Sequence, residues 1–278
     1  MLTQEAIALL SQAQSISAAN EDVGNAPERG AVVYLPSDFA QHDLEKFQPT
    51  RRRARGAMST QSLQDFAAYV EAHAEEGASV FVDQAAMRAT AVLNLGTPAA
   101  PGHADNTAVF APKKTAAYAA LLSVIRTDNG RSLTQTQLAE WMEDWAERID
   151  CERDGDAIAN SKAIAAVRAI TVESARKVES VEQTLSAERT AFESIKADSK
   201  NQPLPGLIHF TCEPYLGFEG RTFALHVAVH PSEKSVTLSL RMAQAEKHEE
   251  EIAAELATKV GTELTGTAPV MLGTYLAK

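Results

Sequence analysis

Four arginines form the most basic stretch of the chain. Arg51, Arg52, Arg53 and Arg55 follow Pro49 within one short segment. Guanidinium groups bind phosphate oxygens in a forked, bidentate geometry, so this loop is a candidate contact for nucleic acid. No aromatic residue is interleaved with the arginines to stack on bases. We therefore favour the alternative that they pair with some of the 37 acidic residues, on one surface or across a subunit contact.

A histidine and a carboxylate lie two residues apart, after a proline-rich loop and before a predicted strand. His103 and Asp105 occupy a position where loops often carry functional side chains. Metal binding or acid–base catalysis would need further ligands or a nucleophile, and no cysteine, glutamate or second histidine is near in sequence. We expect a loop site in which this pair braces a turn.

An enzyme built from His103, Asp105, Cys212 and Glu213 is the least supported hypothesis. Strand alternation places His209 and Cys212 on opposite faces, which argues against a Cys-His nucleophilic couple in that strand. The sequence contains no Walker A loop, no GxGxxG and no GxSxG elbow, and the acidic segment 246–251 lacks the second histidine of a HExxH pair. We predict no catalytic residue, no metal site and no cofactor.

The composition is that of a globular, acidic protein. Apolar residues make up 45% of the chain and charged residues 23%, and the formal net charge is -11. This charge opposes nonspecific attraction to phosphate backbones and anionic lipid. The sequence shows no basic leader and no apolar run of the ~18 residues that span a bilayer. We expect the reducing cytoplasm of a bacterial host and no membrane partner.

Periodicity and turn residues predict an α+β fold. Ser62 and Thr134 are expected N-caps, the latter with Gln137 in a capping box. Strict alternation at 222–229 and 236–242 predicts a hairpin, covered by a helix at 244–260. The expected parts are an N-terminal helix and linker (1–30), an α+β region with a small antiparallel sheet and helices (31–150), a long helix (157–197), and a C-terminal β-meander plus helix (203–278).

The predicted long helix motivates self-association. No proline or glycine occurs between 157 and 197, and a three-four apolar spacing runs through this segment. Thr171, Ser174 and Glu188 interrupt the seam, but its apolar residues still require a partner surface. They are Ile164, Val167, Val178, Val181, Leu185, Phe192 and Ile195. We therefore expect a homo-oligomer.

Several segments together resemble the YfdQ-like family of uncharacterised phage and prophage proteins. They are residues 43–47 (DLEKF) with the following arginine-rich run, 66–70 (FAAYV), 102–105 (GHAD), 134–144 (TQTQLAEWMED), 210–215 (FTCEPY) and 221–223 (RTF). The resemblance implies a phage-type cytoplasmic protein, considered alongside recombination and early genes. It implies no reaction and no catalytic residues.

The leading hypothesis is a non-enzymatic, homo-oligomeric accessory protein of a phage or prophage. It would bind a host or phage macromolecule in DNA metabolism or in countering host defence, with carboxylates placed where DNA phosphates would lie. One alternative is a nucleic-acid binder that uses the arginine loop. Another is a self-assembling structural protein of shell or capsid type.

Overall fold

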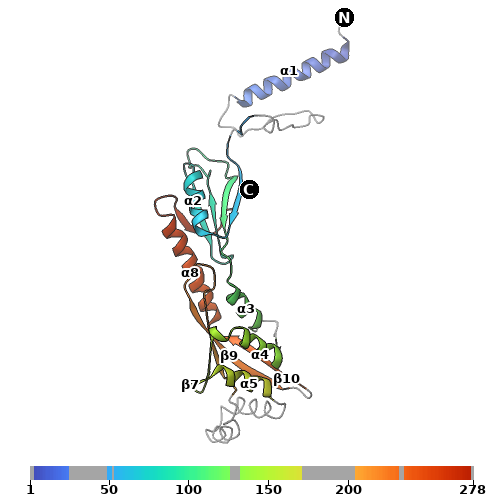
Figure 1. Cartoon of the computed structure of the whole chain (residues 1–278). Helices are drawn as coiled ribbons and strands as arrows, with labels where there is room; N and C mark the ends of the chain where they lie inside the picture. Colours follow the sequence, from blue (N-terminus) through green and yellow to red (C-terminus); the bar gives the residue numbers. More distant parts are fainter. Residues whose placement is uncertain are drawn as a thin grey trace, which may run out of the picture. The chain divides into compact units, whose positions relative to one another are not determined.

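The computed structural model describes residues 3–24, 49–51, 53–125, 132–170, 204–231 and 235–276. The chain divides by its internal contacts into two units, Met1–Ala54 and Arg55–Lys278. In the first unit, the described residues include α1 (Gln4–Gly24), the N-terminal helix predicted within residues 1–30 (Figure 1). Six α-helices and two mostly antiparallel sheets in the described residues confirm the α+β class.

The first sheet of the second unit has five strands. They are β1 (Gly56–Thr60), β2 (Ser79–Asp83), β3 (Arg88–Val92), β4 (Asn106–Phe110) and β11 (Val270–Leu272), in the order β1-β4-β3-β2-β11. The three central strands pair antiparallel, whereas β1 and β11 pair parallel with β4 and β2. The prediction of an antiparallel sheet is therefore confirmed for the central strands only.

Helix α2 (Leu63–His73) packs on this sheet. Ser62 caps it as predicted, because the Ser62 hydroxyl accepts a hydrogen bond of 3.2 Å from the backbone N–H of Asp65. Phe66 and Val70, one turn apart, are fully buried, and the Phe66 ring lies 5.9 Å from that of Phe110. Burial of each such side chain contributes about 1.5–3 kcal/mol, which fixes the helix on the sheet.

The second sheet has six antiparallel strands. They are β5 (Leu133–Thr134), β6 (Ile149–Arg153), β7 (Asp156–Ile158), β8 (Leu207–Cys212), β9 (Arg221–Pro231) and β10 (Val236–Met242), in the order β5-β10-β9-β8-β6-β7. The predicted hairpin is confirmed as β9 and β10. Its inward residues are buried as expected: Phe223, Leu225, Val227, Val229, Val236, Leu238, Leu240 and Met242.

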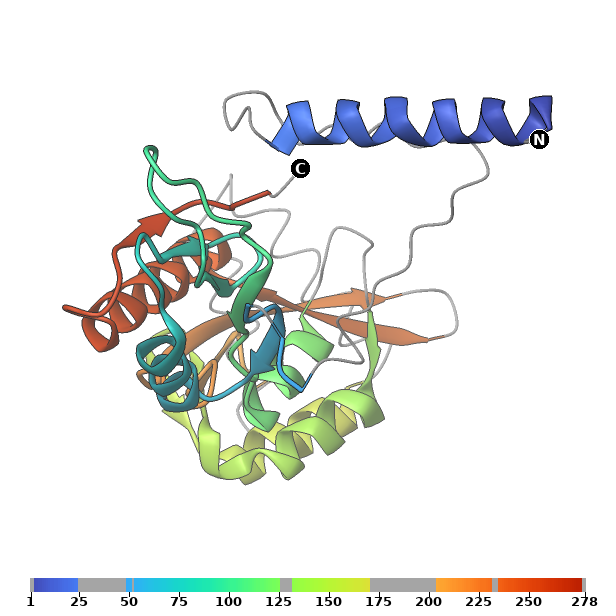
Figure 2. The same cartoon turned by 90° about the horizontal axis from the view of Figure 1, so that it is seen from above.

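Three helices that precede the hairpin in sequence cover this sheet. They are α3 (Ala116–Val124), α4 (Gln135–Asp144) and α5 (Asn160–Ala169), and they pack beside β8, β10 and β6 (Figure 2). The capping box of α4 is confirmed, with Thr134 and Gln137 each bonded to the other's backbone N–H. The Trp141 ring stacks on Phe210 at 5.3 Å. The helix that Thr134 caps ends at Asp144, and Ile149 begins β6.

Helix α8 (Ala245–Glu263) runs from one sheet to the other (Figure 1). Its apolar stripe, Ile252, Leu256 and Val260, is buried as predicted. The helix contacts α2, β2 and β11 of the five-stranded sheet. It also reaches the six-stranded sheet, where His248 lies 4.8 Å from the ring of Phe223. The expected cover of the hairpin is therefore shared between α8 and the earlier helices.

The expected division between the long helix, which ends at 197, and the C-terminal part, which begins at 203, does not separate the two sheets. β8 pairs with β6, and β10 pairs with β5, so both sides of that boundary contribute to one sheet. β11, near the end of the chain, completes the other sheet. The proline and glycine residues that suggested a boundary mark the entry into an interior strand instead.

The prediction of one continuous helix over 157–197 is wrong in its described part. Residues 156–158 form β7, and α5 ends at Ala169 because Ile170 has an extended backbone (φ -63, ψ 130). Val167 is fully buried, and Ile164 packs against the core of its own chain. These two seam residues are therefore covered within the chain and need no second copy.

Several other predictions lie outside the described residues. They concern Arg52 and the seam residues Val178, Val181, Leu185, Phe192 and Ile195. Among the helices that the structure describes, none combines the length and the apolar character required to cross a bilayer.

Candidate functional site

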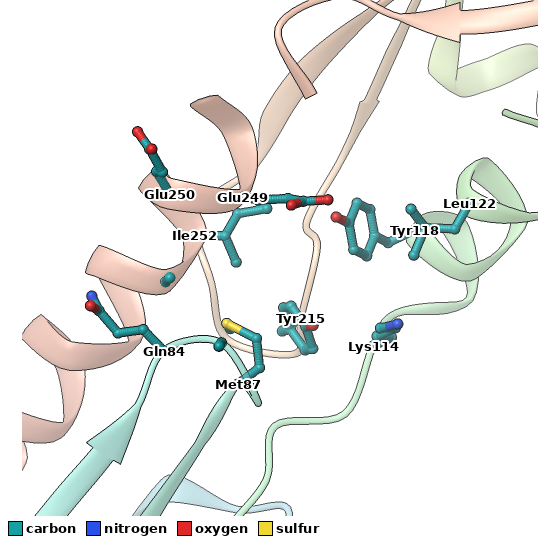
Figure 3. A pocket seen from close by; sticks show the side chains of 11 residues that line it. Gln84, Met87, Lys114, Tyr118, Leu122, Tyr215, Glu249, Glu250 and Ile252 are labelled. Carbon is teal, nitrogen blue, oxygen red and sulfur yellow. The ribbon is translucent and has the colours of Figure 1, made fainter. Parts of the chain in front are cut away.

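A cavity of about 610 Å³ opens where the two sheets of the second unit meet (Figure 3). Four segments line it: the turn from β2 to β3, the start of α3, the loop after β8, and the first turns of α8. They contribute Gln84 and Met87, then Lys114, Tyr118 and Leu122, then Tyr215, and finally Glu249, Glu250 and Ile252. Its volume is that of a small-molecule or peptide site.

Hydrogen bonds of Thr115 link two of these segments, the start of α3 and the loop after β8. Its hydroxyl accepts a 3.1 Å hydrogen bond from the backbone N–H of Tyr118, which caps α3, and donates one of 2.5 Å to the carbonyl of Glu213. The Thr115 N–H also donates to the carbonyl of Pro214 at 3.2 Å. Lys114 and Tyr215 form an isolated antiparallel bridge alongside. One residue thus orients both tyrosines of the cavity.

The two tyrosines are buried and protonated. Tyr118 is 6% exposed and Tyr215 is 7% exposed, and their ring centroids lie 6.0 Å apart. Burial raises the pKa of Tyr118 to about 12, with smaller contributions from Tyr215 and Glu249. Burial, and then Glu249, also raises the pKa of Tyr215. Both phenols therefore keep their protons at neutral pH.

Neither phenol has a hydrogen-bond partner among the described residues. The Tyr118 hydroxyl points toward the carboxylate of Glu249 across the cavity, and Tyr215 lies beside Met87 (Figure 3). Neither hydroxyl is among the fully buried polar atoms that lack a partner, so each reaches the open space of the cavity. These two are available to a bound group.

Arg221 on β9 holds α8 in place at the cavity. Its guanidinium bonds Glu251 at 2.8 Å and Glu255 at 2.9 Å. Glu249 points into the cavity and Glu250 lies at its edge with the carboxylate directed away (Figure 3), and neither makes an ion pair with another described residue. Glu251 and Glu255 therefore hold α8 in place, whereas Glu249 is left for a ligand.

The comparisons with known proteins identify the family. The sequence model of the family described as "Uncharacterized conserved protein (DUF2303)" matches residues 3–275. The chain belongs to this family. Neither the curated proteins nor the solved structures gave a match. The function of this DUF2303 chain is therefore inferred from the geometry of its site.

Asp105, predicted as half of a loop site, serves the backbone of its loop. Its carboxylate accepts a 2.9 Å hydrogen bond from the side chain of Asn94, and Asn94 in turn accepts one of 3.0 Å from the Asn106 N–H. Asn94 and Asn106 are buried. Gly102 lies against Asn94 so closely that a Cβ would be 2.0 Å from its carbonyl oxygen. The expected brace by the His103–Asp105 pair stays a prediction, because the contact shown for Asp105 is with Asn94.

His103 is exposed, and no cluster of three or more His, Cys, Asp or Glu residues suited to a metal ion occurs in the described parts of the chain. His103 and Asp105 precede β4 in one sheet, whereas Cys212 ends β8 in the other. His209 forms a 3.1 Å pair with Glu152 on the neighbouring strand. The four residues of the hypothetical enzyme site therefore lie beside two different sheets: His103 and Asp105 precede β4, and Cys212 and Glu213 lie at the end of β8.

Both cysteines are buried and their thiols are held protonated. Burial raises the pKa of Cys151 and of Cys212 to about 11. A thiol with a pKa this high carries little thiolate at neutral pH, so neither cysteine is an activated nucleophile.

The contact of the arginine loop with nucleic acid stays a prediction. Arg51 and Arg55 are exposed and Arg53 is partly buried, and each interacts with other residues. Arg51 and Arg53 belong to the first unit and Arg55 to the second.

Sequence reasoning missed the cavity. Helical patterns at 115–125 and 244–260 predict two of its walls, and 210–215 is one of the segments that carry the family resemblance. No local pattern in the sequence links Tyr118, Tyr215 and Glu249. The only local signal was the excess of carboxylates at the start of α8, which is also typical of a solvated helix terminus.

Proposed function

We propose that this chain is a non-enzymatic accessory protein of phage or prophage type, of the YfdQ-like kind. It acts in the host bacterial cytoplasm by binding a host or phage macromolecule in DNA metabolism or in countering host defence. The six resembling segments support the phage assignment. One observation carries the binding role: Tyr118 and Tyr215 are largely buried residues whose hydroxyl groups lack partners among the described residues and line the cavity.

The chemistry of the site supports binding over turnover. A general base or nucleophile needs a pKa near the working pH, whereas the pKa of Tyr118 is about 12 and those of the two cysteines are about 11. Such phenols act as neutral hydrogen-bonding groups.

The charge of the chain supports a basic partner. The formal net charge is -11, and Glu249 and Glu250 place two carboxylates at the cavity. Carboxylates arranged where a partner expects phosphates would occupy a DNA-binding face. A protein of DNA metabolism or of host defence offers such a face.

A capture experiment tests this proposal. The full-length chain and a variant with Tyr118→Phe, Tyr215→Phe and Glu249→Gln are immobilised and exposed to nuclease-treated bacterial extract. We expect a defined protein partner to be retained by the wild type and by the control Glu263→Gln, which alters a carboxylate of α8 outside the cavity. Equal retention on the triple variant would overturn the role of the cavity.

We also propose that the protein forms a homo-oligomer, now on the basis of α1. Ile7, Leu9 and Leu10 are 55%, 67% and 53% exposed on this helix, and large apolar side chains in such proximity favour association with a second copy. Light scattering at micromolar concentration is expected to give a multiple of the 29.9 kDa chain mass. A monomer would remove this part of the proposal.

The same exposed helix favours the second candidate, a self-assembling structural protein. Terminal arms that carry apolar residues commonly join neighbouring subunits, and closed rings or shells result when the contact repeats. Electron microscopy of the purified protein distinguishes this candidate, because only assembly into particles would support it.

A further inference from the structure

The cavity combines hydrogen-bond acceptors with a negative field. The carboxylates of Glu249 and Glu250 and the phenol oxygens of Tyr118 and Tyr215 are acceptors, and Lys114 supplies the one ammonium among the lining residues. The charged lining residues, Glu249, Glu250 and Lys114, carry a formal net charge of -1, and Glu249 is the carboxylate that points inward (Figure 3). A group that donates several hydrogen bonds and carries positive charge complements this set.

The field of Glu249 reaches both phenols. This carboxylate contributes to the raised pKa of Tyr118 and of Tyr215, which means that it disfavours negative charge at either phenol oxygen. The same field favours positive charge in the space between the three side chains. An anionic ligand placed there would be repelled.

The remaining walls of the cavity suit the aliphatic part of a ligand side chain, which would lie beside the faces of the aromatic rings. Met87, Leu122 and Ile252 provide apolar surface, and the two tyrosine rings provide faces that attract cations (Figure 3). The volume of about 610 Å³ exceeds that of one side chain, so flanking residues of the ligand would also enter.

We propose that this cavity receives an arginine or lysine side chain, carried by an extended basic segment of the macromolecular partner. Tyr118 is more than nine-tenths buried and its hydroxyl, unpaired among the described residues, is aimed at the space that the cationic head group would fill. The carboxylate of Glu249 neutralises the charge, and the phenol oxygens accept the remaining N–H groups. The inference rests on the proposed binding function and specifies the chemistry of the partner.

Capped tripeptides test the inference directly by calorimetry with the full chain. The probes are acetyl-Ala-Arg-Ala-amide and acetyl-Ala-Lys-Ala-amide, with citrulline and norleucine replacing Arg and Lys as neutral isosteres. We expect saturable binding of at least one cationic probe at up to millimolar concentration, and binding of its neutral isostere about ten-fold weaker or more. Absence of saturable binding of both cationic probes, or equal binding of a cationic probe and its isostere, would overturn the inference.

Variants locate the site. Glu249→Gln is expected to weaken binding of the cationic probe about ten-fold, and Tyr118→Phe to weaken it by a smaller factor, whereas Glu263→Gln leaves it unchanged. Unchanged thermal unfolding of the three variants excludes a folding defect. If Glu249→Gln binds the cationic probe as the wild type does, the cavity is not the site and the proposal fails.

The two proposals fail separately. If the triple variant loses the captured partner while neither cationic peptide binds, the proposed function stands and the cationic ligand is wrong. If a cationic peptide binds in the cavity while capture of the partner is the same on the triple variant, the ligand chemistry stands and the proposed function is wrong.

Discussion

Tyr118 of α3 and Tyr215 of the loop after β8 lie with ring centroids 6.0 Å apart, each more than nine-tenths buried. Their hydroxyl groups have no partner among the described residues, and Thr115 orients both. The pair joins two segments that are distant in sequence. Both tyrosines line the cavity, so this contact brings the start of α3 and the loop after β8 together at its wall.

The Tyr118 hydroxyl and the Thr115 N-cap of α3 are expected to contribute differently to the free energy of unfolding. Tyr118→Phe removes a hydroxyl without a protein partner, so the free energy of unfolding is expected to change by less than about 0.5 kcal/mol. Thr115→Ala removes the N-cap and the bond to Glu213, with an expected loss of about 2 kcal/mol. Urea unfolding measures both. A larger loss for Tyr118→Phe would mean that the hydroxyl is satisfied in the folded protein.

Alkaline pH is expected to destabilise the protein. Burial raises the pKa of Cys151 and Cys212 from 9.0 to about 11, and that of Tyr118 from 10.0 to about 12. The unfolded chain releases these protons at lower pH than the folded chain does. The stabilising contribution is therefore complete below pH 9 and is lost as the pH rises through 11 and 12, on the order of 2 kcal/mol per group.

Urea unfolding between pH 8 and pH 11.5 measures this decline, and Tyr118→Phe provides its control. The variant lacks one of the titrating groups, so its free energy of unfolding should decline less than that of the wild type above pH 10. Parallel curves for the two proteins would contradict the assignment of a raised pKa to Tyr118.

A single methyl group at Gly102 is expected to disrupt the loop that precedes β4. The Cβ of Gly102→Ala would lie 2.0 Å from the carbonyl oxygen of Asn94, which belongs to the buried bracing network, so the backbone must shift. We expect a loss of about 2–4 kcal/mol. Gly261→Ala, in α8 with nothing within 4 Å of its new Cβ, should stabilise by about 0.5–1 kcal/mol. Thermal unfolding compares the two, and equal effects would contradict the close approach.

The ion pairs of Arg221 are expected to matter more than an exposed pair. Arg221 is 17% exposed and its partner Glu255 is 11% exposed, so Arg221→Ala removes a largely buried ion pair at a cost of about 1.5–3 kcal/mol, although Glu255 keeps the Glu219 N–H and Lys259 as partners. Arg168 and Glu143 are 49% and 48% exposed, and Arg168→Ala should cost less than about 1 kcal/mol. Denaturant unfolding checks the difference. Similar losses would mean that Arg221 does not anchor α8.

Local patterns of the sequence predicted individual elements well. The Thr134–Gln137 capping box and the alternation around Phe223 involve residues a few positions apart. Their contribution to stability therefore depends little on the rest of the chain.

Contacts between segments distant in sequence explain the elements that local patterns predicted wrongly. The alanine-rich stretch after residue 156 has helical character, yet residues 156–158 join β7 because β6 offers them a strand partner. Ile170 ends α5 although no proline or glycine is near. Such choices follow from interactions with segments that a local window does not contain.

The sequence by itself determined the helix caps, the β9–β10 hairpin, the acidic balance and the α+β class, because each of these follows from neighbouring residues or from composition. The tertiary structure alone decided the parallel edge strands, the end of α5 and the cavity. Tyr118, Tyr215 and Glu249 come from three segments without a shared local signal. Only the packing of α8 and α3 against both sheets places their polar groups together, since a site of this kind is a property of the packed chain.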